Sequence, residues 1–299
     1  MARLGDWSGP GRASGPIPAV QLSGTTRLVG LIGWPVERTL SPVIHNAAFA
    51  ALGMDWAYVA LPVLPDRVPE AVAGLAALGF AGVNVTMPHK EVVAPLMSVL
   101  SDDAARLQAV NTVDFSTAAG PAGHNTDVMG FARFLSDDAA YDAAGRTALV
   151  LGAGGAARAC ALALARAGAT SIAVAARDAG RAADVSRCLW GLDVEVRSLP
   201  WAAAAGVPAD VVVNATPVAD PDALPLPPLS EGMLVVDLRY RPPVTPLVAR
   251  AHRSGAAAFG GLGMLMHQAG LSFELWTGQV PPAAAMSAAA LAAMAEPLV

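Results

Sequence analysis

The chain has 299 residues, enough for two domains of ordinary size, and 54% of them are hydrophobic while 14% are charged. This composition is typical of a compact globular protein and excludes a disordered chain. The net charge of −5, without a stripe of Lys and Arg, argues against a nucleic-acid partner. The two cysteines, Cys160 and Cys188, have neither metal-ligand spacing nor a disulfide framework, so we expect small apolar packing residues in a reducing compartment.

We expect neither a signal peptide nor a membrane span. Residues 1–26 are rich in Gly and Pro and lack the apolar stretch of a signal peptide, so we expect a flexible tail. Segment 282–295 is rich in Ala and predicts a helix. No uninterrupted apolar run reaches the 18 residues that would predict a membrane span. We therefore expect a cytoplasmic protein without a membrane partner.

After residue 26, short apolar runs alternate with segments of helical pattern. The expected strands are 28–33, 56–63 and 82–87, and the expected helices between them are 41–53 and 69–79. This β-α-β rhythm predicts a mainly parallel sheet covered by helices.

The helix at 41–53 has sequence signals at both ends. Ser41 is predicted as its N-cap and Pro42 as its first helical residue, because those positions favour these residue types. Gly53 is predicted to close its C-terminus.

A second α/β unit begins near residue 126. Segment 147–169 predicts a strand, a glycine turn and a helix. Further strands are expected at 171–177, 194–199, 209–217 and 232–240, and a helix follows a Gly-rich turn at 264–278. The sequence therefore predicts two α/β units with a cleft between them.

The glycine turn of the second unit reads Gly152-Ala-Gly-Gly-Ala-Ala157 and lies directly between a strand and a helix. Gly152 allows the tight turn, Gly154 lets the backbone approach a pyrophosphate, and Ala157 allows close packing of helix on strand. The helix N-terminus offers backbone N–H groups to phosphates. This arrangement predicts dinucleotide binding.

The end of the next strand bears on the choice between NAD and NADP. NAD binding favours a carboxylate there, whereas NADP needs a cation for its 2′-phosphate. Ala176 ends the strand without an acid, and Arg177 and Arg181 follow it. Asp178 either caps the next helix or weakens phosphate binding. The pattern favours NADP and leaves NAD open.

Polar residues follow the strands of the first unit at positions where a buried core carries none. They are Thr39, Ser41, Asn84, Thr86, His89, Lys90, Asn111, Thr112, Asn125, Thr126 and Asp127. Ligands of open α/β sheets bind at the carboxyl ends of strands, where these groups fall.

Eight segments, in this order, resemble the signature segments of the shikimate dehydrogenase family. They are GWPVERTLSPVIHNAAF, GVNVTMPHK, AVNT, HNTDVMGF, GAGGAARA, NATP, DLRYRPPVTPL and GLGMLMHQAGLSFELW. The resemblance covers residues 28 to about 280 and implies an NADP-dependent enzyme that reversibly reduces 3-dehydroshikimate to shikimate in the chorismate pathway to aromatic amino acids. It implies a small-molecule substrate, and the enzyme is expected as a monomer or homodimer.

The same resemblance implies a domain division. Residues 27–125 would be the substrate-binding and catalytic domain, an open α/β domain with a mainly parallel sheet. Residues 126–264 would be a Rossmann-type NADP domain, and 265–299 would return to pack on the first domain.

The resemblance also implies roles for individual residues. Lys90 and Asp127 match the catalytic pair. The residues implied to bind the substrate are Thr39, Ser41, Thr86, Asn111, Tyr240 and Gln268. The residues implied to line the cofactor are Gly152, Ala153, Gly154, Gly155, Ala156, Arg177, Arg181, Asn214, Ala215, Thr216, Leu238 and Gly261. No metal is expected, since no His/Cys/Asp/Glu group has zinc or calcium spacing.

The chemistry of a ketone reduction fits these residue types independently. The carbon receives a hydride and the oxygen a proton, which a nearby ammonium can deliver while stabilising the developing alkoxide. Lys90 suits this task because the pKa of a lysine responds readily to burial. A carboxylate such as Asp127 would orient Lys90 and favour its charged form.

Five positions depart from the common family pattern. Thr39 stands where serine is usual, Arg38 where histidine is frequent, and Val128 where glycine is frequent. Ala176 and Asp178 replace an asparagine and a threonine. A quinate or aminoshikimate dehydrogenase using NAD or NADP is therefore the first alternative. A non-catalytic NADP-binding sensor is the second, although a sensor has no need of a proton donor.

Other conspicuous side chains have structural interpretations. His89 is expected to shape a loop, and His45 to pack or to make capping hydrogen bonds on its helix. Trp190 and Trp276 are expected to be apolar anchors.

Overall fold

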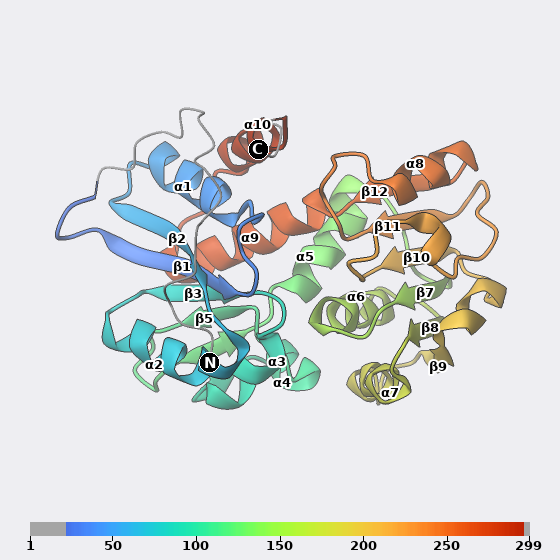
Figure 1. Cartoon of the computed structure of the whole chain (residues 1–299), viewed down its shortest axis with the longest axis horizontal. Helices are drawn as coiled ribbons and strands as arrows, with labels where there is room; N and C mark the ends of the chain where they lie inside the picture. The colour runs from blue at the N-terminus through green and yellow to red at the C-terminus, as the bar shows by residue number, and fades with distance from the viewer. Residues whose placement is uncertain (1–21, 296–299) are drawn as a thin grey trace.

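The computed structural model of the chain describes residues 22–295. Two six-stranded sheets lie beside each other and are joined by the helices α5 (Asp127–Arg133) and α9 (Leu262–Thr277) (Figure 1). Residues 1–21 of the expected tail lie outside the described residues. The expected tail ends at residue 26, and its last residues have a fixed place on the first sheet. The hydroxyls of Ser23, Thr25 and Thr26 donate to the carboxylate of Asp55.

The first sheet has the strand order β2-β1-β3-β5-β6-β4. Its strands are β1 (Arg27–Gly33), β2 (Trp56–Pro62), β3 (Gly82–Val85), β4 (Val99–Leu100), β5 (Thr112–Asp114) and β6 (Ala122–His124). The three predicted strands β1, β2 and β3 are parallel, as expected. β5 runs antiparallel to both β3 and β6, so the far half of the sheet is mixed.

Helices cover both faces of the first sheet. They are α1 (Ser41–Ala51), α2 (Val68–Ala77), α3 (Lys90–Val93) and α4 (Asp102–Leu107), with 3₁₀ turns at Pro65–Arg67 and Ala94–Leu96. The predicted cap of α1 was wrong by one residue: Leu40 is the N-cap, and Ser41 is already helical. The hydroxyl of Thr39 accepts the backbone N–H of Ser41 at 3.2 Å, which explains why Ser41 is not needed as a cap.

The second sheet is entirely parallel, with the strand order β12-β11-β10-β7-β8-β9. Its strands are β7 (Thr147–Leu151), β8 (Ser171–Ala176), β9 (Glu195–Pro200), β10 (Val211–Asn214), β11 (Leu234–Asp237) and β12 (Ala257–Gly260). Its helices are α6 (Gly155–Arg166), α7 (Ala179–Cys188) and α8 (Pro246–Arg253), with 3₁₀ turns at Trp201–Gly206 and Pro221–Ala223. Numbered from its own first strand, the sheet has the order 3-2-1-4-5-6 of the Rossmann fold, so dinucleotide binding is expected at the start of α6.

Four further helical elements connect or complete the two sheets. They are α5 (Asp127–Arg133), the π-helical turn Phe134–Asp138, α9 (Leu262–Thr277) and α10 (Ala283–Ala295). α9 begins right after the second sheet and runs along the first, and α10 packs on α1 (Figure 1). We call β1–β6 with α1–α4, α9 and α10 the first lobe, and β7–β12 with α6–α8 the second lobe. No helix within residues 22–295 has the length and hydropathy to cross a membrane.

The core of the first lobe depends on the end of the chain. Phe273, Trp276 and Met286 are buried against residues of β1, β2 and α1 such as Phe49. The indole of Trp276 also donates to the carbonyl of Val113 at 3.0 Å, in keeping with its expected role as an anchor.

Three expectations about single side chains have clear outcomes. Trp190 is 87% exposed, so the interpretation of it as a buried anchor was wrong, because the turn after α7 directs it to solvent. His45 is fully buried and stacks on the ring of Tyr58 at 4.4 Å, whereas its ring nitrogens have no hydrogen-bond partner within residues 22–295. Cys160 and Cys188 are buried free thiols, as expected.

Candidate active site

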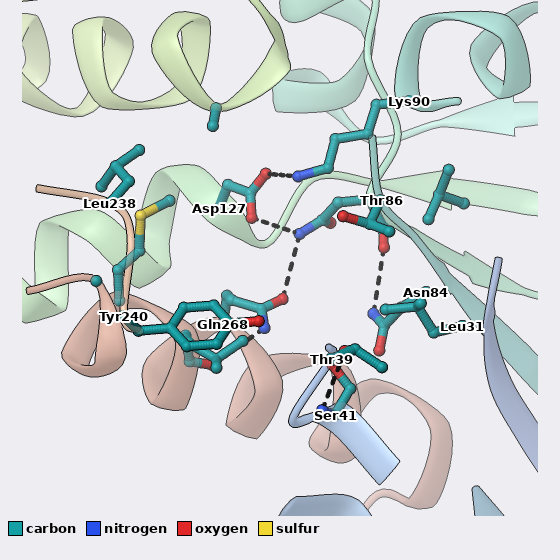
Figure 2. Close-up of a pocket in the computed structure, with 16 residues that line it drawn as sticks. Leu31, Thr39, Ser41, Asn84, Thr86, Lys90, Asp127, Leu238, Tyr240 and Gln268 are labelled. Atoms are coloured by element: carbon teal, nitrogen blue, oxygen red, sulfur yellow. Dashed lines mark hydrogen bonds and ion pairs between the residues drawn. The ribbon is translucent and has the colours of Figure 1, made fainter. Parts of the chain in front are cut away.

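A cavity of about 210 Å³ lies between the two sheets, at the carboxyl ends of their parallel strands (Figure 2). The cavity is lined by all of the residues that were predicted to bind the substrate or to take part in catalysis. They are Thr39, Ser41, Thr86, Lys90, Asn111, Asp127, Tyr240 and Gln268. The remaining lining residues are Leu31, Asn84, Val85, Ala156, Leu238, Gly261, Met264 and Leu265. Both lobes and α9 therefore contribute walls to one polar cavity.

The ion pair between Lys90 and Asp127 forms part of the wall of this cavity. The ammonium Nζ donates to Oδ2 of Asp127 at 2.5 Å, and the two side chains are only 17% and 6% exposed. The second oxygen, Oδ1, accepts from Nδ2 of Asn111 at 2.9 Å. Both carboxylate oxygens are thus engaged, so Asp127 holds the ammonium in one place beside the cavity.

Local structure brings these two residues together. Lys90 begins α3 after the turn that follows β3, and Asp127 begins α5 just after β6. The carbonyl of Lys90 accepts the N–H of Val110 at 2.8 Å, which ties the start of α3 to the segment leading into β5. Charged residues so far apart in the sequence meet because their helices both begin at this edge of the first sheet.

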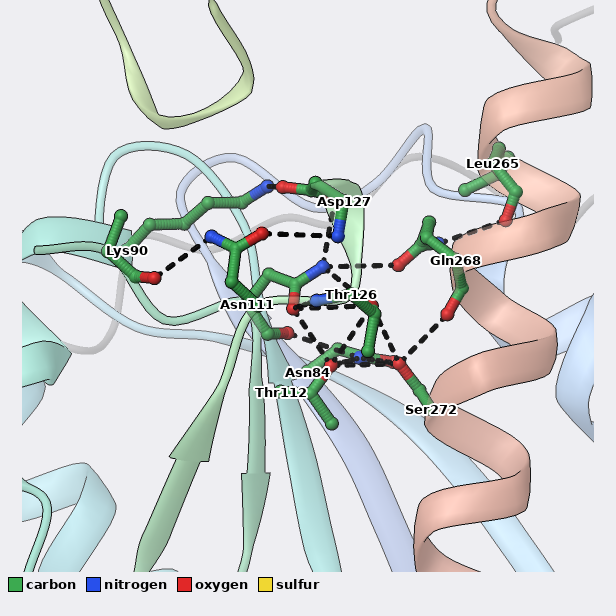
Figure 3. A network of polar contacts seen from close by, with 11 residues as sticks. Asn84, Lys90, Asn111, Thr112, Thr126, Asp127, Leu265, Gln268 and Ser272 are labelled. Carbon is green, nitrogen blue, oxygen red and sulfur yellow. Dashed lines mark hydrogen bonds and ion pairs between the residues drawn. The ribbon is translucent and has the colours of Figure 1, made fainter. Parts of the chain in front are cut away.

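A network of buried hydrogen bonds lies below the cavity (Figure 3). Nδ2 of Asn84 donates to the hydroxyls of Thr112 and Ser272, both at 3.0 Å, and those hydroxyls lie 2.8 Å apart. The hydroxyl of Tyr58 donates to Oδ1 of Asn84 at 2.7 Å. A satisfied network of this kind fixes side-chain positions, since an unpaired buried polar group is costly.

The residues predicted to bind substrate do not include Asn84 or Ser272, although Asn84 is a polar residue within a predicted buried strand. Asn84 lines the cavity and is 5% exposed, while Ser272 is completely buried on α9. A buried asparagine within GVNV was the available signal. Nothing local marked Ser272, because the side chains that it contacts in this network lie more than 140 residues away.

The end of the cavity near α1 carries two hydroxyls. Oγ1 of Thr39 donates to Oγ of Ser41 at 3.2 Å, and Ser41 is almost completely buried. Burial raises the pKa of Tyr240, which outweighs the opposing effect of Arg241, so its phenol stays protonated near neutral pH. Neutral hydroxyl donors are thus available to an anionic or hydroxylated ligand.

The glycine turn has the backbone geometry that the dinucleotide prediction requires. Gly152 has φ +112°, and a Cβ there would lie 3.0 Å from the carbonyl oxygen of Ala215. Gly154 leaves open space, since nothing lies within 4 Å of a Cβ built on it. Thr216 donates to Oδ1 of Asn214 at 2.6 Å, which braces the facing loop. The cradle is therefore closed by backbone on one side and open on the other, a good fit for a pyrophosphate.

One close approach joins this cradle to the cavity, and a second lies within the cavity wall. A Cβ on Gly155 would lie 3.2 Å from Cδ of Lys90, so the glycine turn touches the lysine itself. Gly261 approaches the carbonyl oxygen of Leu238 so closely that a Cβ would stand 2.0 Å from it. Ala156, Leu238 and Gly261 all line the cavity. Of the residues predicted for the cofactor, these three lie at the substrate end of the cradle.

The remaining predicted cofactor residues do not line the cavity. They are Gly152, Ala153, Gly154, Gly155, Arg177, Arg181, Asn214, Ala215 and Thr216. Arg177 is exposed just beyond β8, and Arg181 forms an ion pair with Glu91 of the first lobe at 2.7 Å. Oδ1 of Asp178 accepts the backbone N–H of Arg181 at 3.1 Å, so Asp178 is a helix cap, the first of the two roles considered for it.

Comparison with known proteins gives consistent matches along the chain. Residues 31–113 match the shikimate dehydrogenase substrate binding domain. Residues 135–224 match the shikimate/quinate 5-dehydrogenase family, and residues 261–291 match the shikimate 5′-dehydrogenase C-terminal domain.

Individual relatives agree with these matches. The chain is 43% identical to the shikimate dehydrogenase (NADP(+)) of Citrifermentans bemidjiense, over 92% of this chain and 98% of the relative. The structure resembles the shikimate 5-dehydrogenase of Thermus thermophilus in complex with NADP(H) and shikimate, with a TM-score of 0.79, 36% identity and coverage of 89% and 99%. It also resembles the quinate dehydrogenase of Corynebacterium glutamicum in complex with NAD, with a TM-score of 0.81, 32% identity and coverage of 89% and 99%.

Proposed function

The chain belongs to the shikimate dehydrogenase family, and from this premise we propose that it is an NADP-dependent oxidoreductase that interconverts 3-dehydroshikimate and shikimate. The observation that carries the proposal is the buried Lys90–Asp127 pair, which stands between a polar cavity and a glycine turn for a dinucleotide. The reaction would serve the chorismate route to aromatic amino acids.

The proposed roles follow from the lining of the cavity. Thr39 and Ser41 bind the ring carboxylate through their hydroxyls. The residues that bind the carboxylate or the ring hydroxyls are Thr86, Asn111, Tyr240 and Gln268. Asn84 contributes a fixed amide to the same wall, because its side chain has four hydrogen-bond partners.

Lys90 handles the proton. A nicotinamide bound at the glycine turn would supply the hydride for the ring carbonyl carbon. In the reducing direction the ammonium of Lys90 gives a proton to the carbonyl oxygen. Asp127 orients the ammonium, and Asn111 orients Asp127. In the oxidising direction, neutral Lys90 takes the hydroxyl proton back. Closure of the two lobes would exclude water from this exchange.

The proposed cofactor residues divide into two groups. The segments Gly152–Ala156 and Asn214–Thr216, with Leu238 and Gly261, present backbone and small side chains to the pyrophosphate and nicotinamide. Arg177 and Arg181 would receive the 2′-phosphate of NADP, because an arginine fork matches a phosphate.

The proposed division of the chain follows the two sheets. Residues 27–125 with 265–299 form the substrate domain, and residues 126–264 form the NADP domain. We place the enzyme in the cytoplasm, in keeping with its two free thiols, as a monomer or homodimer acting on small molecules.

A matrix of initial rates tests the proposal. Shikimate and quinate are each assayed with NADP⁺ and NAD⁺, and an aminated analogue is added as a third substrate. The expected result is the highest kcat/KM for shikimate with NADP⁺. A higher kcat/KM for quinate or for the aminated analogue would identify that compound as the preferred substrate. Binding of NADP⁺ without turnover of any substrate would support a non-catalytic sensor.

A further inference from the structure

Glu91, the residue after the catalytic lysine, reaches from the first lobe to two arginines of the second. Its Oε1 accepts from Nη2 of Arg181 at 2.7 Å, and its Oε2 accepts from Nη2 of Arg158 at 3.1 Å. Each oxygen therefore serves one guanidinium. Either arginine can be released without disturbing the oxygen that holds the other.

The two arginines differ in how firmly they are held. The side chain of Arg158 is 6% exposed, donates to the carbonyl of Leu107 at 3.0 Å and lies 3.6 Å from Asp184. The side chain of Arg181 is 51% exposed, and Glu91 is its only acidic partner within residues 22–295. Arg158 is thus a fixed anchor for Glu91, whereas Arg181 is free to exchange partners.

Arg181 also stands at the place where the two dinucleotides differ. It lies in the first turn of α7, just beyond β8, and in a Rossmann fold this strand end receives the ribose 2′ position. The carboxylate of Asp178 is engaged by the backbone of Arg181 as a helix cap. Glu91 is therefore the carboxylate that competes with a 2′-phosphate for the guanidinium of Arg181.

We propose that Glu91 sets the preference between NADP and NAD by acting as an exchangeable partner of Arg181. It holds the guanidinium when no 2′-phosphate is bound and releases it to the phosphate, while Arg158 keeps Glu91 in place. Glu91 therefore weakens the binding of 2′-phosphorylated ligands and leaves the others unaffected. This inference rests on the proposed use of NADP.

Isothermal titration calorimetry on the full-length protein tests the inference without relying on turnover. The ligands are 2′,5′-ADP and 5′-AMP, which differ only in the 2′-phosphate, followed by NADP⁺ and NAD⁺. In Glu91→Gln we expect about two- to fivefold tighter binding of 2′,5′-ADP and NADP⁺, the range of a partly exposed ion pair. The dissociation constants for 5′-AMP and NAD⁺ should stay at the wild-type values.

Two further variants isolate the contact. In an Arg181→Ala background, adding Glu91→Gln should no longer tighten 2′,5′-ADP binding, because the exchangeable guanidinium is gone. Asp184→Asn is the matched control: it removes a carboxylate from the same cluster, near Arg158 and not Arg181, and should leave the ratio of the two affinities unchanged. Thermal unfolding is recorded for every variant. If Glu91→Gln does not fold, Glu91→Asp, which keeps the charge with a shorter reach, must shift the affinity ratio in the same direction.

The outcomes separate this inference from the proposed function. A wild-type protein that binds 2′,5′-ADP no better than 5′-AMP contradicts both. A wild-type preference for 2′,5′-ADP that Glu91→Gln leaves unchanged, or a gain shared equally by 5′-AMP, overturns the role of Glu91 alone. Persistence of the gain in the Arg181→Ala background does the same.

Discussion

The two lobes meet at one cavity but line it with different kinds of groups, polar side chains in one lobe and mainly backbone in the other. The first lobe contributes buried side chains, among them Asn84 and Asn111, which are joined by a hydrogen bond. Apart from the phenol of Tyr240, the second lobe contributes mainly backbone and small or apolar side chains, with glycines at the points of closest approach. A substrate is distinguished by the placement of its substituents, which demands fixed side chains, whereas phosphates are bound well by N–H groups of a turn. Substitutions should therefore act through lost functional groups in one lobe and through added atoms in the other.

Removing a functional group from the first lobe should have the largest effect. Lys90→Ala deletes the proton donor, and general acid catalysis is worth about 100- to 10,000-fold in rate. We expect a fall in kcat of that size with NADP⁺ affinity close to wild type, measured by steady-state kinetics and calorimetry. An unchanged kcat would remove Lys90 from the mechanism.

Adding one methyl group to the glycine turn tests the other half of the comparison. Gly152→Ala places a side chain at φ +112° against Ala215, so we expect a loss of about 1–3 kcal/mol in the free energy of unfolding and weaker NADP⁺ binding.

Gly154→Ala is the matched variant of this pair. Its φ of −82° suits any residue and its surroundings are open, so stability should be unchanged while NADP⁺ binds about tenfold more weakly, or about 1.4 kcal/mol. Both are measured by urea unfolding and calorimetry. Equal losses of stability in the two variants would contradict the distinction between a closed and an open side of the cradle.

Acid should destabilise the lobe with the buried polar groups. Burial lowers the pKa of His45 from 6.5 to about 3, so below pH 6.5 the unfolded chain takes up a proton that the folded chain does not. The stability contributed by neutral His45 is complete above pH 6.5 and falls by about 1.4 kcal/mol per pH unit below it, or about 2 kcal/mol by pH 5.

The His45→Phe variant should flatten this dependence. Urea unfolding at several values between pH 7 and pH 5 measures the slope. His252→Gln, an exposed change in the second lobe, should keep the wild-type slope. If His45→Phe retains the full slope, other groups carry the acid sensitivity.

A smaller effect is expected from the network below the cavity. Ser272→Ala removes one of the acceptors of Asn84 and leaves others in place, so we expect a loss of about 1 kcal/mol in the free energy of unfolding and a raised KM for shikimate. Thr277→Ala, on the same helix, removes a hydroxyl that bonds only locally and should leave KM unchanged. A KM that moves equally in both would indicate a general effect on α9.

The sequence was most informative where local pattern decides structure. The eight strands β1–β3 and β7–β11 and the glycine turn follow from apolar runs and residue spacing, and all of them are present. β4, β5 and β6 were not predicted, because two or three residues carry too little periodicity. β12 was not predicted either, because it runs directly into the Gly-rich turn at residues 260–263. The cap of α1 shifted by one residue because Thr39, outside the helix, supplies the acceptor.

The candidate site shows the same limit. The residues predicted to bind substrate line one cavity, although their roles remain predictions. The bonds of Ser272 to Asn84 and of Arg181 to Glu91 join residues 188 and 90 positions apart. The first pair is set by the packing of α9 on the first sheet and the second by the packing of the two lobes, and no local pattern encodes either.

The return of α9 and α10 to the first lobe has a consequence for the newly made chain. Synthesis proceeds from the N-terminus, so β1, β2 and α1 leave the ribosome long before Phe273, Trp276 and Met286, which complete their core. The second lobe lies in one uninterrupted stretch and can close first. The part of the protein that is translated earliest is therefore finished last, and its apolar faces must wait for the final helices.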